Sequence, residues 1–355
     1  MVAIPGKNRS AGVGALMIMT CIGLAAAGCS SSSSSSSSST TSSPSSSSTS
    51  GATKHTGTVN VAYASSIQYL NEKIVGPAFT TGQGYTYSGR GGASGELESE
   101  IAAGVITPNV FESVGGDNIT PLEPKFTTWY IQYASTQIVV AYNPKSKYAS
   151  DFKAYANGSK PLSSLFTLMQ TPGFKLGRTD PNIDPQGRAF IFMLELAQTH
   201  YNLPADTVSK ILGTSDFGTA NSLQIFAESS LDATLQSGQL DASSAYLNQA
   251  IQLHLPYIAL PAVINLGTPA DKALYKKASV TITTKGKKST KHGSPLAIDI
   301  TTIGSPSAAG TAFVAYTLSS TGKAQYTQGG YTLITPKIFG DASAVPASVK
   351  SEIGS

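Results

Sequence analysis

Cysteine is almost absent from this chain of 355 residues, which contains only Cys21 and Cys29. Because no cysteine follows Cys29, the sequence beyond it can form no disulfide and no cysteine-ligated metal site. Histidine is also scarce, and its spacing includes no metal-binding pattern such as HExxH. We therefore expect no enzyme activity and no cofactor, and a surface hydrolase or an adhesive protein remain as alternatives. The histidines are His55, His200, His254 and His292.

Charge is low as well, since Asp, Glu, Lys and Arg together make up 12% of the residues. The formal net charge of the whole chain is +4. Residues 1–28 hold two positive charges, Lys7 and Arg9, and no negative charge, so without them the net charge is +2. A nucleic-acid-binding protein is usually far more basic. We expect no nucleic-acid partner.

The N-terminus has the layout of an export signal. Lys7 and Arg9 precede an uncharged, apolar or small stretch over 11–27, which is short for a spanning helix. The small residues before Cys29 resemble a lipobox, in which Ala26 replaces the usual leucine. This pattern predicts a lipoprotein signal peptide over residues 1–28, with cleavage before Cys29 and a lipid on Cys29. The alternative is an uncleaved anchor helix.

A serine-rich segment follows. Residues 30–50 are serine and threonine apart from Pro44, and such a stretch cannot bury apolar surface. We expect residues 29–56 to form a disordered linker, and about 20 flexible residues reach roughly 25 Å. A glycosylated stalk is the alternative. The layout predicts a lipid-anchored protein on the extracytoplasmic face of the cell membrane.

The remaining body, from about residue 57 to 341, is long enough for two domains. Short apolar runs typical of strands alternate with helical patterns, which predicts an α/β fold with a largely parallel sheet. Residues 341–355 are small and polar, and we expect a loose tail. The predicted strands are 59–64, 85–87, 110–114, 138–142, 175–180, 242–246 and 279–282, and the predicted helices include 70–79, 96–103, 185–197 and 231–235.

One pattern recurs where a predicted strand gives way to a helix. Ser65-Ser66, Ser94-Gly95 and Pro185-Gln186-Gly187 each stand at such a junction. Helix N-termini expose unpaired N–H groups and a partial positive charge, and serine hydroxyls add donors. Several such turns together predict an anion site, whereas each turn alone could be an ordinary helix cap.

Three stretches carry a resemblance to a known family, namely 129–147, 177–187 and 260–267. The body resembles the solute-binding proteins of molybdate/tungstate ABC importers, especially the archaeal-type branch. The resemblance implies a type II periplasmic-binding fold, with two α/β lobes and a two-strand hinge near Thr136–Ile138 and Leu260–Val263. Residues 57–137 and 261–340 would form lobe 1, and residues 138–260 would form lobe 2. A monomer would capture the oxyanion in the cleft and deliver it to an ABC permease.

The resemblance also implies ligand-binding residues, with the metal bound only as its oxyanion. Ser66 and Ser94 match serines of the family's first two turns, and Asp180 matches an aspartate that contacts the metal. The backbone N–H near Gln186 matches a donor at a helix start, and Tyr246 matches a cleft tyrosine. The alternative for Ser66 and Ser94 is helix capping. Asp180 could instead be a turn or cap residue, and Tyr246 could be packed in the core.

Some positions depart from the family pattern. Archaeal-type members bring a second carboxylate from the strand of Tyr246, where our alignment places Ala245. A single carboxylate favours a four-coordinate oxyanion. Phosphate or sulfate remains an alternative ligand, and Asp180 could accept the proton of a phosphate. Arg188 either approaches the site or is exposed, and Arg90 is a second candidate cation.

Overall fold

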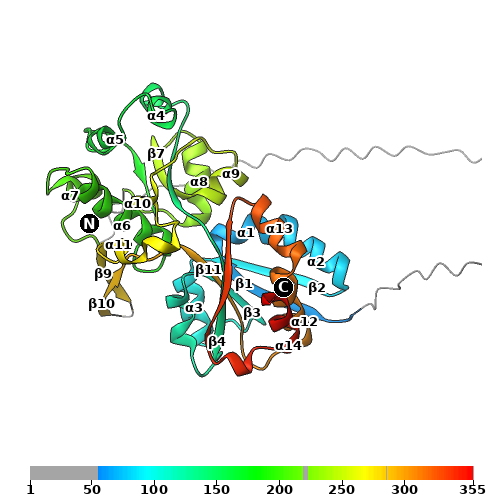
Figure 1. Cartoon of the computed structure of the whole chain (residues 1–355). Coiled ribbons are helices and arrows are strands. Elements are labelled where there is room, and N and C mark those ends of the chain that lie inside the picture. The colour runs from blue at the N-terminus through cyan, green and yellow to red at the C-terminus, as the bar shows by residue number, and fades with distance from the viewer. Residues whose placement is uncertain (1–54, 219–222, 285, 355) are drawn as a thin grey trace, which may run out of the picture. The chain divides into compact units, whose positions relative to one another are not determined.

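The computed structural model describes residues 55–218, 223–284 and 286–354. The predicted signal peptide, Cys29 and nearly all of the predicted linker lie outside these residues. Within the described part, no helix combines the length and apolar character that crossing a membrane requires. The described residues form two lobes, each built around a sheet (Figure 1).

The larger lobe contains a six-stranded sheet in the order β12-β4-β11-β3-β1-β2. Strand β1 runs parallel to β2 and β3, whereas β11 runs antiparallel to β3 and β4, and β12 runs antiparallel to β4. The strands are β1 (Thr58–Ala64), β2 (Thr86–Gly92), β3 (Val110–Val114), β4 (Trp129–Ser135), β11 (Ala297–Thr302) and β12 (Thr332–Gly340).

The smaller lobe contains a four-stranded sheet in the order β6-β7-β5-β8. Strand β7 is parallel to β6 and antiparallel to β5, which is also antiparallel to β8. These strands are β6 (Leu176–Gly177), β7 (Ala242–Tyr246), β5 (Ile138–Tyr142) and β8 (Tyr257–Ile258). The prediction of a largely parallel sheet is wrong, because both sheets are mixed. Parallel neighbours in a sheet are joined by a crossover, usually a helix. Consecutive strands such as β4 and β5 lie in different sheets and are not joined in this way.

Helices cover both faces of the larger sheet, and β1 shows the alternation that makes this possible. Val61 packs with Phe79 of α2 (Gly76–Gln83) and Phe313 of α12 (Ala308–Leu318). The next residue, Ala62, packs instead with Leu97 of α3 (Ser94–Ala102). Successive side chains of a strand point to opposite faces, so both faces of β1 are apolar and buried.

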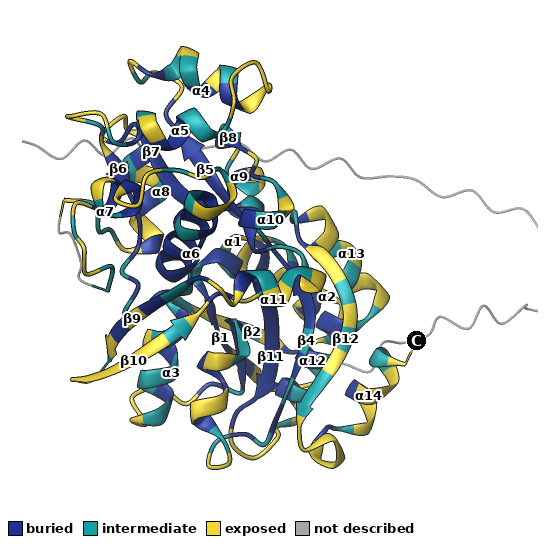
Figure 2. Cartoon of the chain, turned by 60° about the vertical axis from the view of Figure 1, so that its left-hand side comes forward, coloured by how far each residue is buried: buried dark blue, intermediate teal, exposed yellow. Residues whose placement is uncertain are grey.

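The smaller sheet is built in the same way. In β5, Val140 packs with Phe190 of α6 (Pro185–His200), whereas Val139 packs with Leu231 of α8 (Glu228–Gln236). All five residues of β5 and of β7 are buried (Figure 2), which explains their uninterrupted apolar or small character. Further helices are α1 (Gln68–Leu70), the π-helical turn 71–75, α4 (Ala149–Ala156), α5 (Ser163–Leu168), α7 (Thr207–Leu212), α9 (Leu247–Gln252) and α13 (Ser320–Gln328).

The chain passes from the larger sheet to the smaller one between Ser135 and Ile138. Beside it, the returning chain lies at Leu296, whose carbonyl accepts a hydrogen bond from Thr136 N at 2.9 Å. We expected the return near Leu260–Val263, and that boundary is wrong. The segment after it stays with the smaller lobe, as the 2.7 Å bond from Ser279 N to Glu195 Oε2 on α6 shows. This segment comprises α10 (Ala262–Asn265), α11 (Lys272–Tyr275), β9 (Ser279–Thr284) and β10 (Lys287–His292).

The C-terminal segment is ordered, contrary to the predicted loose tail. It forms α14 (Ala347–Ile353), which packs on α12. Val345 and Val349 are buried, and Asp341 Oδ1 accepts from Ser343 N at 2.8 Å at the start of the segment. Two well-placed valines and a capped turn are enough to fix a segment whose composition is otherwise small and polar.

Candidate functional site

The two lobes touch directly around the segments that follow β2, β3 and β6. Gly95 N, at the start of α3 in the larger lobe, donates to Ile183 O of the smaller lobe at 3.2 Å. Arg188 Nη2 on α6 donates to Asn118 Oδ1 of the larger lobe at 3.4 Å. The predicted site residues are therefore found at or near a junction between lobes.

Ser66 lies in the short 3₁₀ turn (Ser65–Ile67) that follows β1. Its residue is 2% exposed, and its Oγ has no hydrogen-bond partner among the described residues. The hydroxyl does not cap the turn, whose N-cap residue is Ala64. Because buried hydroxyls nearly always have a partner, a free one at a lobe junction is a candidate donor to a ligand.

Ser94 is the first residue of α3 and is also buried. Its Oγ accepts a 3.2 Å hydrogen bond from Val114 N at the end of β3, which leaves the hydroxyl proton available for donation. The neighbouring glycine-rich segment belongs to β2 and forms no turn. Arg90 of that strand is exposed, and its charge is paired with Glu100 at 2.6 Å.

Asp180 and Glu228 line a common cavity of about 390 Å³. Oδ1 of Asp180 accepts from Asn182 N at 2.9 Å and from Asn182 Nδ2 at 2.7 Å. Oε1 of Glu228 accepts from Gln249 Nε2 at 2.9 Å and from Gln186 Nε2 at 3.2 Å. In each carboxyl the other oxygen receives no hydrogen bond from the described residues, so both groups are anchored through one oxygen and have the second one free.

Gln186 supports this arrangement with its side chain. Its Oε1 accepts from Ser244 Oγ at 2.8 Å, and its Nε2 holds Glu228 and contacts Gln249 Oε1 at 2.9 Å. The predicted ligand donor is a backbone N–H near Gln186, and the N–H of Gln186 itself already has a partner in this structure. That N–H donates to Asp184 Oδ1 at 2.8 Å, because Asp184 is the N-cap of α6.

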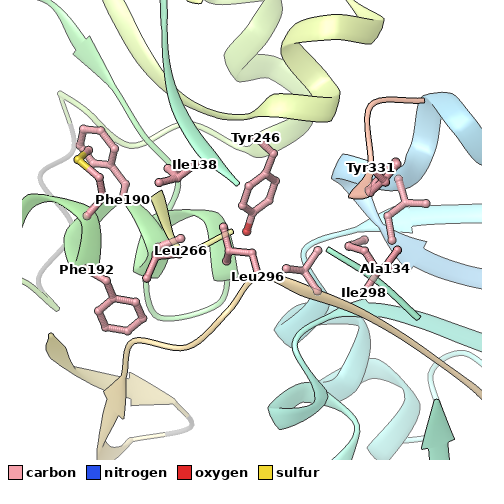
Figure 3. Packing of buried hydrophobic residues seen from close by; sticks show 14 of the residues in the cluster. Ala134, Ile138, Phe190, Phe192, Tyr246, Leu266, Leu296, Ile298 and Tyr331 are labelled. Carbon is pink, nitrogen blue, oxygen red and sulfur yellow. The ribbon is translucent and has the colours of Figure 1, made fainter. Parts of the chain in front are cut away.

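Tyr246 ends β7, and Figure 3 shows its ring pointing away from the strand, with the hydroxyl toward Leu296. The residue is 1% exposed, and its hydroxyl has no partner in the described part of the chain. Burial, with Asp184 and Glu228 nearby, raises the pKa of Tyr246 well above its ordinary value. The phenol therefore stays protonated and can donate a hydrogen bond.

Buried charges surround these hydroxyls. Burial raises the pKa of Asp184 to about 6, and burial with the nearby Asp184 and Asp232 raises the pKa of Glu228 well above its ordinary value. Arg188 is 6% exposed, so it is not an exposed helix residue, and it also donates to Pro181 O at 3.3 Å. No group of three or more His, Cys, Asp or Glu residues that could hold a metal ion occurs within the described ranges.

The second carboxylate was missed from the sequence. Ala245 packs in the apolar cluster with Val139 and Leu231, on the α8 side of the smaller sheet. A glutamate there would enter that cluster, so Ala245 cannot stand in the place of a ligand-binding carboxylate. Glu228, at the first position of α8, instead brings a second carboxyl to the cavity that Asp180 lines. Its one sequence signal is an acidic residue at a helix start, which usually means only a favourable helix dipole.

Comparisons with known proteins agree with this architecture. Residues 59–332 match the family model described as bacterial extracellular solute-binding protein. A Haloferax volcanii protein, named as a candidate ABC-transporter molybdenum-binding protein, is 33% identical over 159 residues, which are 45% of this chain and 47% of that protein. The molybdate/tungstate-binding protein WtpA of Pyrococcus abyssi is 28% identical over 246 residues, 64% of this chain and 68% of that protein. The chain thus spans about half the length of the first relative and about two thirds of the second.

A solved structure shows the same fold. The periplasmic molybdate-binding protein of Azotobacter vinelandii superposes with a TM-score of 0.50 and 17% identity, covering 78% of this chain and 99% of that one. The predicted type II periplasmic-binding fold is confirmed, and the reported relatives are named as binding proteins, the Haloferax one as part of an ABC transporter. With the family model covering most of its length, the chain belongs to the bacterial extracellular solute-binding proteins.

Proposed function

We propose that this protein captures a tetrahedral oxyanion of the molybdate/tungstate type between its lobes and delivers it to an ABC importer. One observation carries the proposal: buried hydroxyls with a proton to donate stand at the lobe junction, where two carboxyls have a free oxygen. The hydroxyls belong to Ser66, Ser94 and Tyr246, and the carboxyls to Asp180 and Glu228. The names of the Haloferax and Pyrococcus relatives support this ligand class.

The two carboxyls give a physical basis for selectivity. Hydroxyl donors would hold the oxygens of any tetrahedral oxyanion, but carboxylates repel a dianion. Molybdenum and tungsten can accept further oxygen ligands, whereas sulfur and phosphorus in sulfate and phosphate cannot. In the proposed complex, the free oxygens of Asp180 and Glu228 complete a six-coordinate metal together with four oxo ligands. The four-coordinate mode expected from the sequence depended on Ala245.

Phosphate is the second candidate, because a free carboxylate oxygen could accept the proton of hydrogen phosphate. In the proposed mode this interaction is worth less than metal coordination, and sulfate has neither a proton to share nor an open coordination position. We expect the order molybdate or tungstate first, then phosphate, then sulfate.

Calorimetric titration of the purified protein with the four anions tests the proposal. Sub-micromolar binding of molybdate or tungstate that excess sulfate does not displace would support it. Tight phosphate binding without molybdate binding would replace it with the phosphate alternative, and no binding of any anion would remove the oxyanion function.

The cellular setting is part of the same proposal. A lipid on Cys29 and a linker over residues 29–56 would keep the monomer on the extracytoplasmic face of the membrane, beside its ABC permease. The unaltered protein should incorporate a labelled fatty acid, and replacing Cys29 with alanine should abolish that label. An unaltered protein that incorporates no label and keeps residues 1–28 would instead favour the uncleaved anchor helix.

A further inference from the structure

The side chain of Asn248 joins three parts of the molecule. Asn248 lies in α9 of the smaller lobe and is fully buried. Its Nδ2 donates to Ser66 O at 2.8 Å and to Tyr331 Oη at 2.8 Å, both in the larger lobe. Its Oδ1 accepts from Thr136 Oγ1 at 2.7 Å, on the segment where the chain crosses between the lobes. One carboxamide therefore links both lobes and the crossing.

The chemistry of the group suits this place. A carboxamide carries two donor hydrogens and an acceptor oxygen, and here both donors and the acceptor are used. The Tyr331 hydroxyl also reaches Ser66 O at 3.0 Å, so Asn248, Tyr331 and Ser66 form a closed triangle of hydrogen bonds. An aspartate of the same shape could keep the bond from Thr136 but could donate to neither partner in the larger lobe.

The position of Asn248 relates it to the proposed site. It bonds directly to the backbone of Ser66, and it follows Tyr246 by two residues at the junction of β7 and α9. The unpartnered hydroxyls of Ser66 and Tyr246 come from different lobes, so their separation depends on how the lobes are held together. Asn248 is the side chain that connects these two segments with hydrogen bonds.

We infer that Asn248 is a positioning residue that couples the lobes, so that the Ser66 turn, the Tyr246 segment and the crossing at Thr136 move as one unit. Its coupling of the lobes is independent of the ligand. Its effect on affinity rests on the proposed oxyanion function. Loss of the carboxamide should allow the ligand-free lobes to separate, and ligand binding would then have to close them again.

Small-angle X-ray scattering of the ligand-free protein is the direct test. Asn248→Ala should increase the radius of gyration, and Asn248→Asp should do the same because it loses both donors. Asn143→Ala is the matched control, since Asn143 is buried and its Oδ1 bonds only within the smaller lobe, to Lys145 N at 2.8 Å. The control should lower the midpoint of thermal unfolding without changing the scattering. Thr136→Val removes one bond with little change of shape and should give a smaller increase, which keeps the test open if Asn248→Ala does not fold.

Molybdate titration provides the second readout. Asn248→Ala should weaken binding about tenfold to a hundredfold, within the usual range of conformational coupling, while Asn143→Ala leaves affinity unchanged. Scattering curves of Asn248→Ala and Asn248→Asp identical to that of the unaltered protein would overturn the inference. If the unaltered protein binds none of the anions, the proposed function fails, but the scattering comparison still decides the role of Asn248.

Discussion

Glu228→Gln is the substitution that most directly tests the proposed coordination. Glutamine has the shape of glutamate, and its Oε1 can still accept from Gln186 and Gln249, as Glu228 Oε1 does at 3.2 and 2.9 Å. The change therefore replaces the oxygen that receives no bond from the described residues with an uncharged NH2 group, which cannot coordinate a metal. Charged polar interactions contribute about 1.5–3 kcal/mol, so molybdate affinity should fall by about 10- to 150-fold.

The same substitution should not destabilise the ligand-free protein. Burial disfavours the charged form of Glu228 and raises its pKa, so a neutral glutamine should leave the ligand-free midpoint of unfolding unchanged or increase it. The unaltered protein must release the proton of Glu228 when the carboxylate binds the metal. Its molybdate affinity should therefore rise with pH until the pKa of Glu228 is passed, and the glutamine variant should lose that part of the slope.

The assay is calorimetry across a pH series, combined with X-ray absorption at the metal edge to determine the coordination number. Glu195→Gln is the control, because Glu195 is a partly buried carboxylate on the same lobe whose partner is Ser279 N, outside the proposed site. If Glu228→Gln binds molybdate as tightly as the unaltered protein, then Glu228 acts as a neutral donor, and the coordination argument is refuted. A four-coordinate spectrum would refute it independently.

Three further predictions concern the site and the fold. Ser94→Ala should weaken molybdate binding in calorimetry while thermal unfolding changes little, because the hydroxyl accepts only one long bond, from Val114 N at 3.2 Å; unchanged affinity removes Ser94 from the site. Burial raises the pKa of Asp299 to about 8, so its contribution to stability is complete below its ordinary pKa and is lost as pH rises through 8. In denaturant unfolding, Asp299→Asn should therefore flatten the pH dependence of the free energy of unfolding. Above pH 8 it should stabilise the protein by at most about 6 kcal/mol, at about 1.4 kcal/mol per pKa unit. An unaltered pH dependence of that free energy contradicts this. Val349→Ala should cost about 1–3 kcal/mol in the same assay, whereas a loose tail would give no effect.

Several strands could be placed from the sequence because burial alone determines them. The apolar runs 110–114 and 138–142 coincide with β3 and β5, each of which is buried along its full length. The small-residue run 242–246 coincides with β7 for the same reason. Sheet order was harder to predict, because the chain leaves the larger sheet after β4 and returns to it only at β11. No local pattern records which strands become neighbours after such a crossing.

Some site residues could also be predicted from local sequence, whereas others could not. Ser66 and Ser94 stand at helix starts that local turn patterns can predict, and the structure places both at the lobe junction. The sequence did not reveal that the N–H of Gln186 donates to Asp184, the helix cap two residues earlier. Glu228 was missed because its role depends on Gln186 and Gln249, which are distant in sequence and close only in the fold. Membership in such a network cannot be read from a residue's immediate neighbours.

The acidic lining of the junction limits what the protein can bind. A receptor for sulfate would need only donors, and a fixed carboxylate with a free oxygen in the cavity would oppose such a ligand. Asp180 and Glu228 both have this arrangement, and each is oriented by two hydrogen bonds to its other oxygen. Fixed carboxylates disfavour ordinary dianions unless the ligand can interact favourably with them. The ligand can do so through a proton of its own or through an open coordination position at its central atom. Molybdate and tungstate offer the open position, and hydrogen phosphate offers the proton. The coordination number of the bound anion therefore decides between the two ligand classes more directly than affinity alone.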